Sequence, residues 1–295
     1  MASAREALVV ALEAITRGAW DEAAEHAARA RALDPADLLA PALAAHLARG
    51  GDDVYTDPEA FERFIDGGGN VGLYERAGRA LAGVHAERRP TTVLDIGCGE
   101  GRLTAASLRT GLRRLDLVEP SAELLARARR RLDGCDVEVV GHPIGAEALA
   151  AAVPDRRWDV AQSTFALHAV PPPARAAALA DLAGRVGALL VVEFDCPALT
   201  DRSEAHLRHL VDRYEHGLAE YADDPLVAAG FLLPVLVGQI APDAERHTWE
   251  QPIAAWGEDL RAAGFATVRH RRVSDYWWAP AHLIEATAGP APAGI

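Results

Sequence analysis

Three glycines at alternate positions, flanked by two carboxylates, are the residues of this sequence best suited to chemistry. An apolar run carries Asp95 and leads into Gly97, Gly99 and Gly101, and a second apolar run ends in Glu119. Glycine permits positive φ and a close approach of the backbone to a ligand, and a helix that begins after such a turn offers free N–H groups to a negatively charged ligand group. A carboxylate at the end of the next strand, about 20 residues after the first glycine, can accept two hydrogen bonds from a ribose diol. The pattern predicts an adenosine-type site in a βαβ unit.

The form of the turn distinguishes between adenosine ligands. A dinucleotide site has Gly-x-Gly-x-x-Gly, whereas this turn reads Gly-x-Gly-x-Gly after Asp95, which would oppose a diphosphate but suits a cationic amino group. The turn resembles the first motif of the class I S-adenosylmethionine-dependent methyltransferases. The resemblance implies that S-adenosyl-L-methionine is the cofactor, that Asp95 faces its methionine end, that Glu119 and the adjoining Pro120 hold the ribose, and that the glycines and Cys98 line it. The alternative is an ordinary βα turn of an unrelated α/β protein.

Composition narrows the class of protein. Half of the 295 residues are hydrophobic, enough for one large domain or a domain with an appendage. No run approaches ~18 consecutive apolar residues, so no membrane span is expected, and the amino end reads as a charged amphipathic helix rather than a signal peptide. The net charge of −13 argues against a nucleic-acid substrate. All 30 basic residues are Arg, which excludes lysine-nucleophile chemistry, and the three scattered cysteines favour a cytoplasmic location.

Strands and helices alternate from about residue 90, which predicts a parallel sheet with right-handed crossovers. The expected strands are Thr92–Ile96, Leu115–Glu119, Val137–Val140, Asp159–Ser163, Ala188–Phe194, Ala266–Arg272 and Tyr276–Ala286. The resemblance implies a Rossmann-like, seven-stranded class I methyltransferase sheet of the α/β class, mostly parallel with an antiparallel last strand. Ligands of such sheets bind at the carboxyl ends of the strands. The residues that directly follow each strand are therefore the candidates for the site.

Additional helical regions are expected around this sheet. Residues 1–51 are Ala-rich and helical, and the part around Trp20 and Pro35 resembles half of a tetratricopeptide repeat. Because only one repeat is visible, we expect a helical hairpin that packs on the catalytic domain or on a second subunit, as in a homodimer, rather than a peptide-binding array. Gly50–Asp53 is expected to be a short linker, residues 52–89 are expected to form lid or pre-sheet helices, and residues 90–295 the cofactor-binding domain. Within that domain, residues 197–252 are expected to be an inserted helical cap over the substrate.

Further cofactor residues are expected from the resemblance. Tyr74 would reach the methionine carboxylate, with the Gly67–Gly69 run as the hinge of a lid; alternatively, Tyr74 is a core residue. His142 stands where most relatives place an Asp that holds the adenine amino group, so that contact would fall to a backbone amide or to His142 itself. Ser163 and Thr164, at the end of the fourth strand, would border the cofactor.

The string that follows the fourth strand contains the candidate for proton transfer. It ends in Leu167-His168 and resembles small-molecule and quinone methyltransferases, which usually carry a Leu-His there. His168 could accept the substrate proton; the alternative is a structural role. Tyr276–Trp278, read as a strand, would turn one Trp to the core and the other to a helix or a cleft. The expected substrate residues are Glu193, His206, His209, Tyr214, Trp249, Trp277 and Trp278.

The absence of other motifs narrows the acceptor. The strings typical of amino-methylating DNA enzymes, protein arginine methyltransferases and metal-dependent catechol methyltransferases are missing after the fourth strand, and His206 and His209 lack a third metal ligand. We expect methyl transfer to an O, N or C nucleophile of a small molecule, with specialised metabolites as the expected class, and without a metal. The alternatives are a non-methylating enzyme of the same fold, for example a cyclase, and a non-catalytic cofactor-binding scaffold that uses the hairpin.

Overall fold

The computed structural model describes residues 3–50 and 57–289 of the chain. Of the predicted linker Gly50–Asp53, residues 51–53 lie outside the described residues. Contacts divide the chain into two compact units, which are described separately below. One unit groups residues 1–71, 198–246 and 276–278, and the other groups residues 72–197, 247–275 and 279–295.

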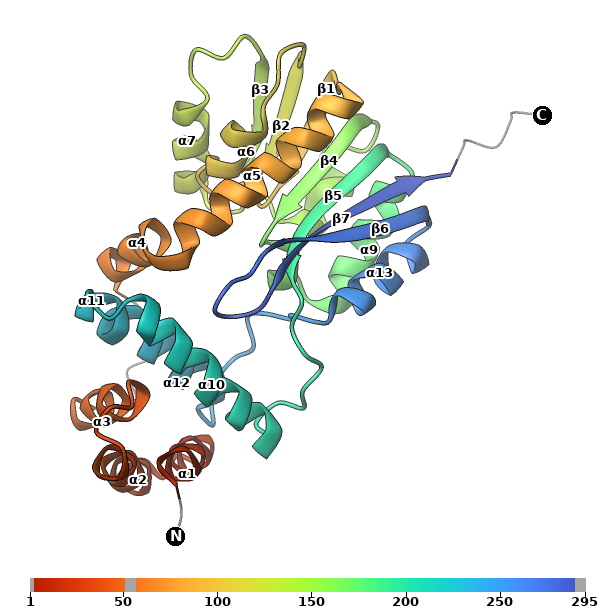
Figure 1. Cartoon of the computed structure of the whole chain (residues 1–295). Helices are drawn as coiled ribbons and strands as arrows, with labels where there is room; N and C mark the ends of the chain where they lie inside the picture. Colours follow the sequence, from red (N-terminus) through yellow and green to blue (C-terminus); the bar gives the residue numbers. More distant parts are fainter. Residues whose placement is uncertain (1–2, 51–56, 290–295) are drawn as a thin grey trace. The chain divides into compact units, whose positions relative to one another are not determined.

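The larger unit is built on a seven-stranded sheet with the order β3-β2-β1-β4-β5-β7-β6 (Figure 1). Its strands are β1 (Thr92–Ile96), β2 (Arg114–Val118), β3 (Glu138–His142), β4 (Trp158–Thr164), β5 (Val186–Phe194), β6 (Phe265–Ser274) and β7 (Ala281–Ala288). The first five strands pair in parallel, and β7 is antiparallel to both β5 and β6. This confirms the predicted class I sheet. Strand order reverses between β1 and β4, which places the expected ligand site at their carboxyl ends.

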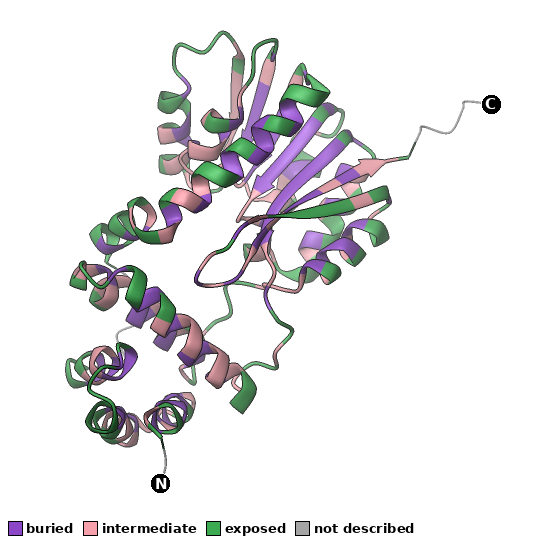
Figure 2. Cartoon of the chain, viewed as in Figure 1, coloured by how far each residue is buried: buried purple, intermediate pink, exposed green. Residues whose placement is uncertain are grey.

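Helices cover both faces of this sheet, and its central strands are accordingly buried on both sides (Figure 2). One face is covered by α5 (Gly68–Arg88), α6 (Arg102–Ser107) and α7 (Ala122–Arg131), and the other by α8 (Leu149–Ala152), α9 (Pro172–Ala183) and α13 (Ile253–Ala262). Val93 joins Leu81 and Leu125 in the core of the first face. Its neighbour Leu94 points to the opposite face and joins Trp256 there. Successive side chains of β1 thus pack into the cores of opposite faces and fix the position of the strand. The loop that follows its carboxyl end carries the glycine motif.

The smaller unit is helical. Its helices are α1 (Ala4–Thr16), α2 (Trp20–Leu33), α3 (Leu39–Ala48), α4 (Pro58–Asp66), α10 (Glu204–Glu220), α11 (Pro225–Val227) and α12 (Leu233–Ile240), with a π-helical turn at Ala228–Leu232. The side chains of Asp57 and Ser203 accept hydrogen bonds from the first turns of α4 and α10 and so cap these two helices. α1 and α2 form a hairpin, α3 packs on α2, and α1 also contacts α10 and α12. The likeness to a tetratricopeptide repeat stays a prediction. No described helix is both long enough and apolar enough to cross a membrane.

The prediction of a strand over Tyr276–Ala286 was wrong at its start. β7 begins at Ala281, and Trp277 and Trp278 lie in the loop between β6 and β7. The Trp277 side chain packs over Gly217 of α10, where a Cβ would come within 3.0 Å of the indole. Both tryptophans contact the same apolar cluster, so they do not alternate between two faces. Burial of the two indole rings stabilises the protein more than the backbone hydrogen bonds of a longer strand would.

Candidate functional site

The loop after β1 carries the glycine motif to the point where strand order reverses. Gly97 and Gly99 have φ of +69° and +54°, a region that disfavours side chains. A Cβ on Gly97 would come within 2.3 Å of the Cβ of Ala166, in the loop after β4, whereas a Cβ on Gly99 would meet no atom within 4 Å. Gly97 therefore allows the two loops to touch. Gly99 borders open space, where a ligand can approach the backbone.

These two glycines allow a matched test of the loop. Gly97→Ala is expected to lower the free energy of unfolding by about 2–5 kcal/mol, because the overlap with Ala166 adds to the cost of a left-handed alanine. Gly99→Ala carries only the second cost, about 1–2 kcal/mol. Urea denaturation of both variants measures the difference. Equal losses would show that the contact between the loops is absent in solution.

Asp95 is buried near the end of β1, with 3% of its surface exposed. Its Oδ2 accepts hydrogen bonds from Thr104 Oγ1 at 2.6 Å and from Gln162 Nε2 at 2.7 Å. Burial raises the pKa of Asp95 to about 6, although the two hydrogen bonds act in the opposite direction. Both donors are neutral, so they supply no counter-charge for the ionised carboxylate. Such a buried anion suits a cationic ligand group.

Glu119 follows β2 and faces the glycine loop. Its Oε2 accepts a hydrogen bond from the backbone N–H of Gly99 at 3.1 Å, and its Oε1 accepts one from the N–H of Ser121 at 2.9 Å. Each oxygen retains a lone pair for a further donor, as a ribose diol requires. Pro120 is exposed beside it. Burial and the charges of Asp95 and Glu119 raise the pKa of the Cys98 thiol, which therefore lines the loop as a protonated thiol.

The His142 ring contacts a buried carboxylate. Its Nε2 lies 2.8 Å from Oδ1 of Asp116, whose Oδ2 also accepts a hydrogen bond from Trp158 Nε1. Arg114 adds two further hydrogen bonds to the same carboxylate. Nε2 of His142 is thus engaged by Asp116, and an adenine contact through the backbone of His142 or through its Nδ1 stays a prediction.

The last two residues of β4 have different surroundings. Ser163 Oγ donates a hydrogen bond to the backbone oxygen of Ile96 at 2.9 Å and thereby joins β4 to β1. Thr164 Oγ1 is buried and has no hydrogen-bond partner among the described residues. Because an unsatisfied buried hydroxyl is costly, Thr164 is the better candidate of the two for a ligand contact.

Aromatic rings gather where β4 and β5 end. Phe165 has a φ of 51°, a strained value for a side chain of this size. Its ring stacks on Phe194, with centroids 4.6 Å apart, and lies 6.2 Å from the ring of Tyr74 on α5. Strained backbone of this kind clusters at functional sites. The three rings form an apolar wall next to the glycine loop.

His168 and Glu193 form a hydrogen-bonded dyad beside this wall. His168 lies in η2 (Leu167–Ala169) after β4, and Glu193, 1% exposed, lies near the end of β5. Glu193 Oε1 accepts a hydrogen bond from the backbone N–H of His168 at 3.1 Å, and its Oε2 lies 2.8 Å from Nδ1 of the ring. This arrangement favours the proton on Nδ1 and leaves Nε2 for another partner.

The charges around His168 favour its protonated form. Burial alone would lower the pKa of the ring, but the charge and hydrogen bond of Glu193 and the charge of Glu250 outweigh burial and the opposing charge of Arg175, and raise the pKa to about 9. A base must be neutral to accept a proton. His168 thus becomes a strong base as the pH approaches 9.

The predicted substrate residues fall into both units. Trp249 lies in the larger unit, where its N–H donates a hydrogen bond to the backbone oxygen of His168 at 2.7 Å. In the helical unit, His206 Nδ1 accepts a hydrogen bond from the N–H of Arg202, and Tyr214 is buried and accepts one from Gln239. The other three members of the helical unit are His209, Trp277 and Trp278. Contact of these residues with a substrate stays a prediction.

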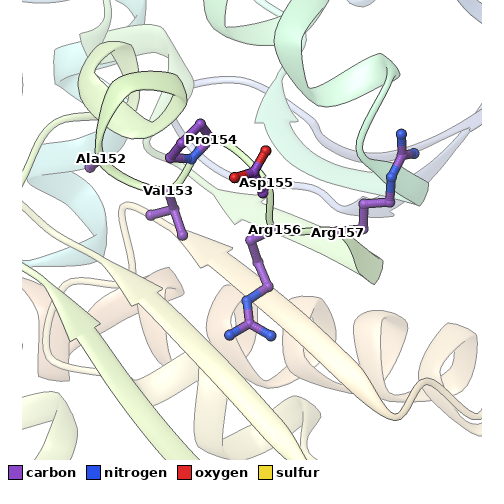
Figure 3. A pocket seen from close by; sticks show the side chains of 6 residues that line it. All are labelled: Ala152, Val153, Pro154, Asp155, Arg156 and Arg157. Carbon is purple, nitrogen blue, oxygen red and sulfur yellow. The ribbon is translucent and has the colours of Figure 1, made fainter.

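Metal-binding clusters and surface pockets are the other features that could mark a site. Among the described residues, no three His, Cys, Asp or Glu side chains are grouped so as to hold a metal ion. A surface pocket is lined by Ala152–Arg157, in the segment that leads into β4 (Figure 3). It lies at the amino end of that strand, whereas the glycine loop and the dyad lie at carboxyl ends.

Several residues of the site were not predicted from the sequence. Gln162 and Thr104 hold Asp95, Phe165 forms the wall, and Arg175 lies behind the loop of His168. A glutamine directly after the apolar Val160 and Ala161 of β4 was the available signal for Gln162. The others depend on side-chain directions that spacing does not reveal.

The site lies within a segment that resembles known proteins. Residues 93–186, from β1 to the start of β5, match a family model described as a methyltransferase domain. No curated protein sequence matches the chain.

Three solved structures share the fold at low identity. Magnesium protoporphyrin IX methyltransferase (ChlM) from Synechocystis PCC 6803, with bound SAH, is 15% identical over 78% of this chain and 93% of its own, with a TM-score of 0.53. The mitomycin 7-O-methyltransferase MmcR is 21% identical over 92% of this chain and 67% of its own, with a TM-score of 0.50. An O-methyltransferase family protein from Burkholderia thailandensis is 19% identical over 75% of this chain and 57% of its own, with a TM-score of 0.50. The chain thus carries a methyltransferase domain over residues 93–186, within a sheet that has the class I fold of S-adenosylmethionine-dependent methyltransferases.

Proposed function

We propose that this protein transfers a methyl group from S-adenosylmethionine to a small organic molecule, such as a specialised metabolite, whose reacting atom carries a proton. The observation that carries this proposal is the position of the His168–Glu193 dyad. Ala166, two residues before His168, would touch a Cβ on Gly97, so the loop of the dyad lies against the glycine loop. A proton acceptor therefore lies next to the expected cofactor site.

The residues of the glycine loop fit the cofactor. Asp95 offers a buried negative charge to the amino group of its methionine part, and Glu119 offers two carboxylate oxygens to the ribose. Gly99 leaves open space beside the backbone. When bound, S-adenosylmethionine supplies an electrophilic methyl group on a sulfonium that is also the leaving group.

The dyad supplies the acid–base part of the reaction. Nε2 of His168 would accept the proton of an O–H or N–H acceptor as the methyl group is transferred, and Glu193 would stabilise the resulting imidazolium. The rings of Tyr74, Phe165 and Phe194 would exclude water and hold an apolar acceptor. A small molecule is also the acceptor class that best fits a chain with a net charge of −13, because a nucleic-acid substrate needs a basic surface.

Transfer of an isotopically labelled methyl group tests this proposal. The protein is incubated at pH 9 with labelled S-adenosylmethionine and a panel of phenols, alcohols, amines and carbon nucleophiles, with Glu119→Ala as the inactive control. We expect label in O–H or N–H acceptors. Consumption of an acceptor without uptake of label would instead indicate a non-methylating enzyme, and cofactor binding without any reaction across the panel would favour a scaffold.

A further inference from the structure

Arg175 of α9 is a charged side chain in the interior of the larger unit, with 2% of its surface exposed. Its guanidinium lies 4.4 Å from the centroid of the Trp256 ring and 3.6 Å from Oδ2 of Asp259, both on α13. Its Nη2 also donates a hydrogen bond to Gln251 Oε1 at 3.0 Å. Burial of an arginine is costly unless its charge and its donors are matched. The site is therefore built to hold this side chain.

One atom of Arg175 joins two segments of the chain. Its Nη1 donates hydrogen bonds to the backbone oxygen of Leu167, at 3.4 Å, and to that of Trp249, at 3.1 Å. The same two segments are also joined directly, because the Trp249 N–H donates a hydrogen bond to the backbone oxygen of His168, at 2.7 Å. Residues 247–252, which we call the strap, are therefore fastened to the loop of His168 by both a direct and a bridged contact.

The strap brings a charge to the dyad. Glu250 lies between the two strap residues that Arg175 holds, Trp249 and Gln251, and its charge acts on His168 in the same direction as that of Glu193. The charge of Arg175 acts in the opposite direction. The charges that act on His168 thus come from three elements and include Glu193 of β5, Glu250 of the strap and Arg175 of α9. Asp259 of α13 pairs with the last of these.

We propose that Arg175 is a positioning residue of the site, which joins the strap to the loop of His168 and thereby holds Glu250 beside the His168–Glu193 dyad. Arg175 does not touch the reacting atoms in this proposal; it acts through the backbone of residues 167 and 249. This proposal rests on the proposed function in one respect: the proposed function makes His168 the base of methyl transfer. The placement of the strap and its effect on the ring can be measured without turnover.

The test is a proton NMR titration of the His168 ring, assigned by its loss in His168→Ala. Arg175→Lys keeps the positive charge but cannot bridge two backbone oxygens and stack on Trp256 as the planar guanidinium does. We expect the midpoint of the His168 titration to fall by about one pH unit in Arg175→Lys and by a similar amount in Glu250→Gln. The double variant should fall no further than either single variant, because both changes remove the same charge from the ring.

Arg185 provides a matched control. It is also buried, and its guanidinium lies 5.0 Å from the indole of Trp158. It pairs with Asp181 and donates hydrogen bonds to the backbone oxygens of residues 153 and 156. Arg185 directly precedes β5, however, and so lies at the amino end of the sheet, away from the dyad. Arg185→Lys should lower the thermal midpoint as Arg175→Lys does, and should leave the His168 titration unchanged.

The outcomes separate this proposal from the proposed function. An unchanged His168 titration in Arg175→Lys, or additive shifts in the double variant, would overturn the role of Arg175, whatever the enzyme methylates. If the titration shifts as expected and the pH profile of methyl transfer does not follow it, the role of Arg175 stands and the assignment of His168 as the base fails.

Discussion

Asp95→Asn is expected to stabilise the protein without cofactor while it weakens cofactor binding. Burial raises the pKa of Asp95 to about 6 in the folded protein, above its ordinary value of 3.8. The folded state therefore binds the proton more tightly than the unfolded state, and ionisation above pH 6 costs about 3 kcal/mol of stability. Both hydrogen bonds, from Thr104 and Gln162, end on the same oxygen, Oδ2. The amide oxygen of asparagine can accept both of them.

The stability gained in Asp95→Asn depends on pH, because only the ionised form of Asp95 is destabilising. The gain in stability of Asp95→Asn should be full above pH 6, decline as the pH falls from 6 to 4, and vanish below the ordinary pKa of the carboxyl group, where Asp95 is protonated in both states. Thermal unfolding of the cofactor-free proteins at pH 4 and pH 8 measures it. In the same variant, the affinity for S-adenosylmethionine should fall by about 10- to 100-fold, because the partner of its amino group loses its charge.

Asp116 provides the control for this experiment. Burial alone would raise its pKa, but hydrogen bonds from Arg114, His142 and Trp158 outweigh burial and lower the pKa below its ordinary value. Asp116→Asn should therefore destabilise the protein at pH 8, because it removes the buried charge that pairs with Arg114 and leaves only the exposed Glu138 as its carboxylate partner among the described residues. A loss of stability in Asp95→Asn similar to that in Asp116→Asn would refute the interpretation of Asp95 as a buried carboxylate kept for a cationic ligand.

Glu193→Gln is expected to move the pH profile of methyl transfer. With the pKa of His168 at about 9, kcat/KM of the unmodified protein should rise about tenfold per pH unit from pH 6 to 8 and level off above pH 9. Glu193→Gln removes the negative charge beside Nδ1, and burial then lowers the pKa of the ring to its ordinary value or below. The plateau should begin about two pH units lower, and its height should fall by about 10- to 100-fold, because the base is weaker.

The shape of the profile distinguishes this role from a structural one. If His168 only supports the loop after β4, Glu193→Gln lowers the rate at every pH and leaves the midpoint in place. His168→Ala provides the second comparison. An alanine variant that keeps full activity at all pH values would show that the ring takes no part in proton transfer.

The elements that depend on neighbouring residues in the sequence, such as β1 and the glycine turn, could be predicted from the sequence. The apolar run of β1 and the glycines after it placed the strand, the turn and the carboxylates Asp95 and Glu119 correctly, because a buried strand and a positive-φ turn leave few alternatives in residue type. The strand predicted from Tyr276 failed because the burial of Trp277 against α10 depends on residues far away in sequence. Local alternation cannot reveal that contact.

The site could be predicted less completely than the fold. His168 was named from its position after the fourth strand, and Glu193 lies near the end of the expected fifth strand, but their pairing depends on the neighbouring positions of β4 and β5 in the sheet. Arg175 carried no signal at all, since an arginine in the first turns of an Ala-rich helix usually faces water. Its role depends on the strap, which comes from a segment more than 70 residues away in sequence.

The most direct test of the account is the binding of S-adenosylmethionine to the glycine loop. Calorimetric titration should give micromolar affinity for the unmodified protein and a loss of about 100-fold or more for Glu119→Ala, which removes both acceptors of the ribose. Glu123→Ala is the control, because Glu123 is exposed in the first turn of α7 and its ion pair is with Arg127 of the same helix. It should bind as the unmodified protein does. Unchanged affinity in both Glu119→Ala and Asp95→Asn would contradict the assignment of the site.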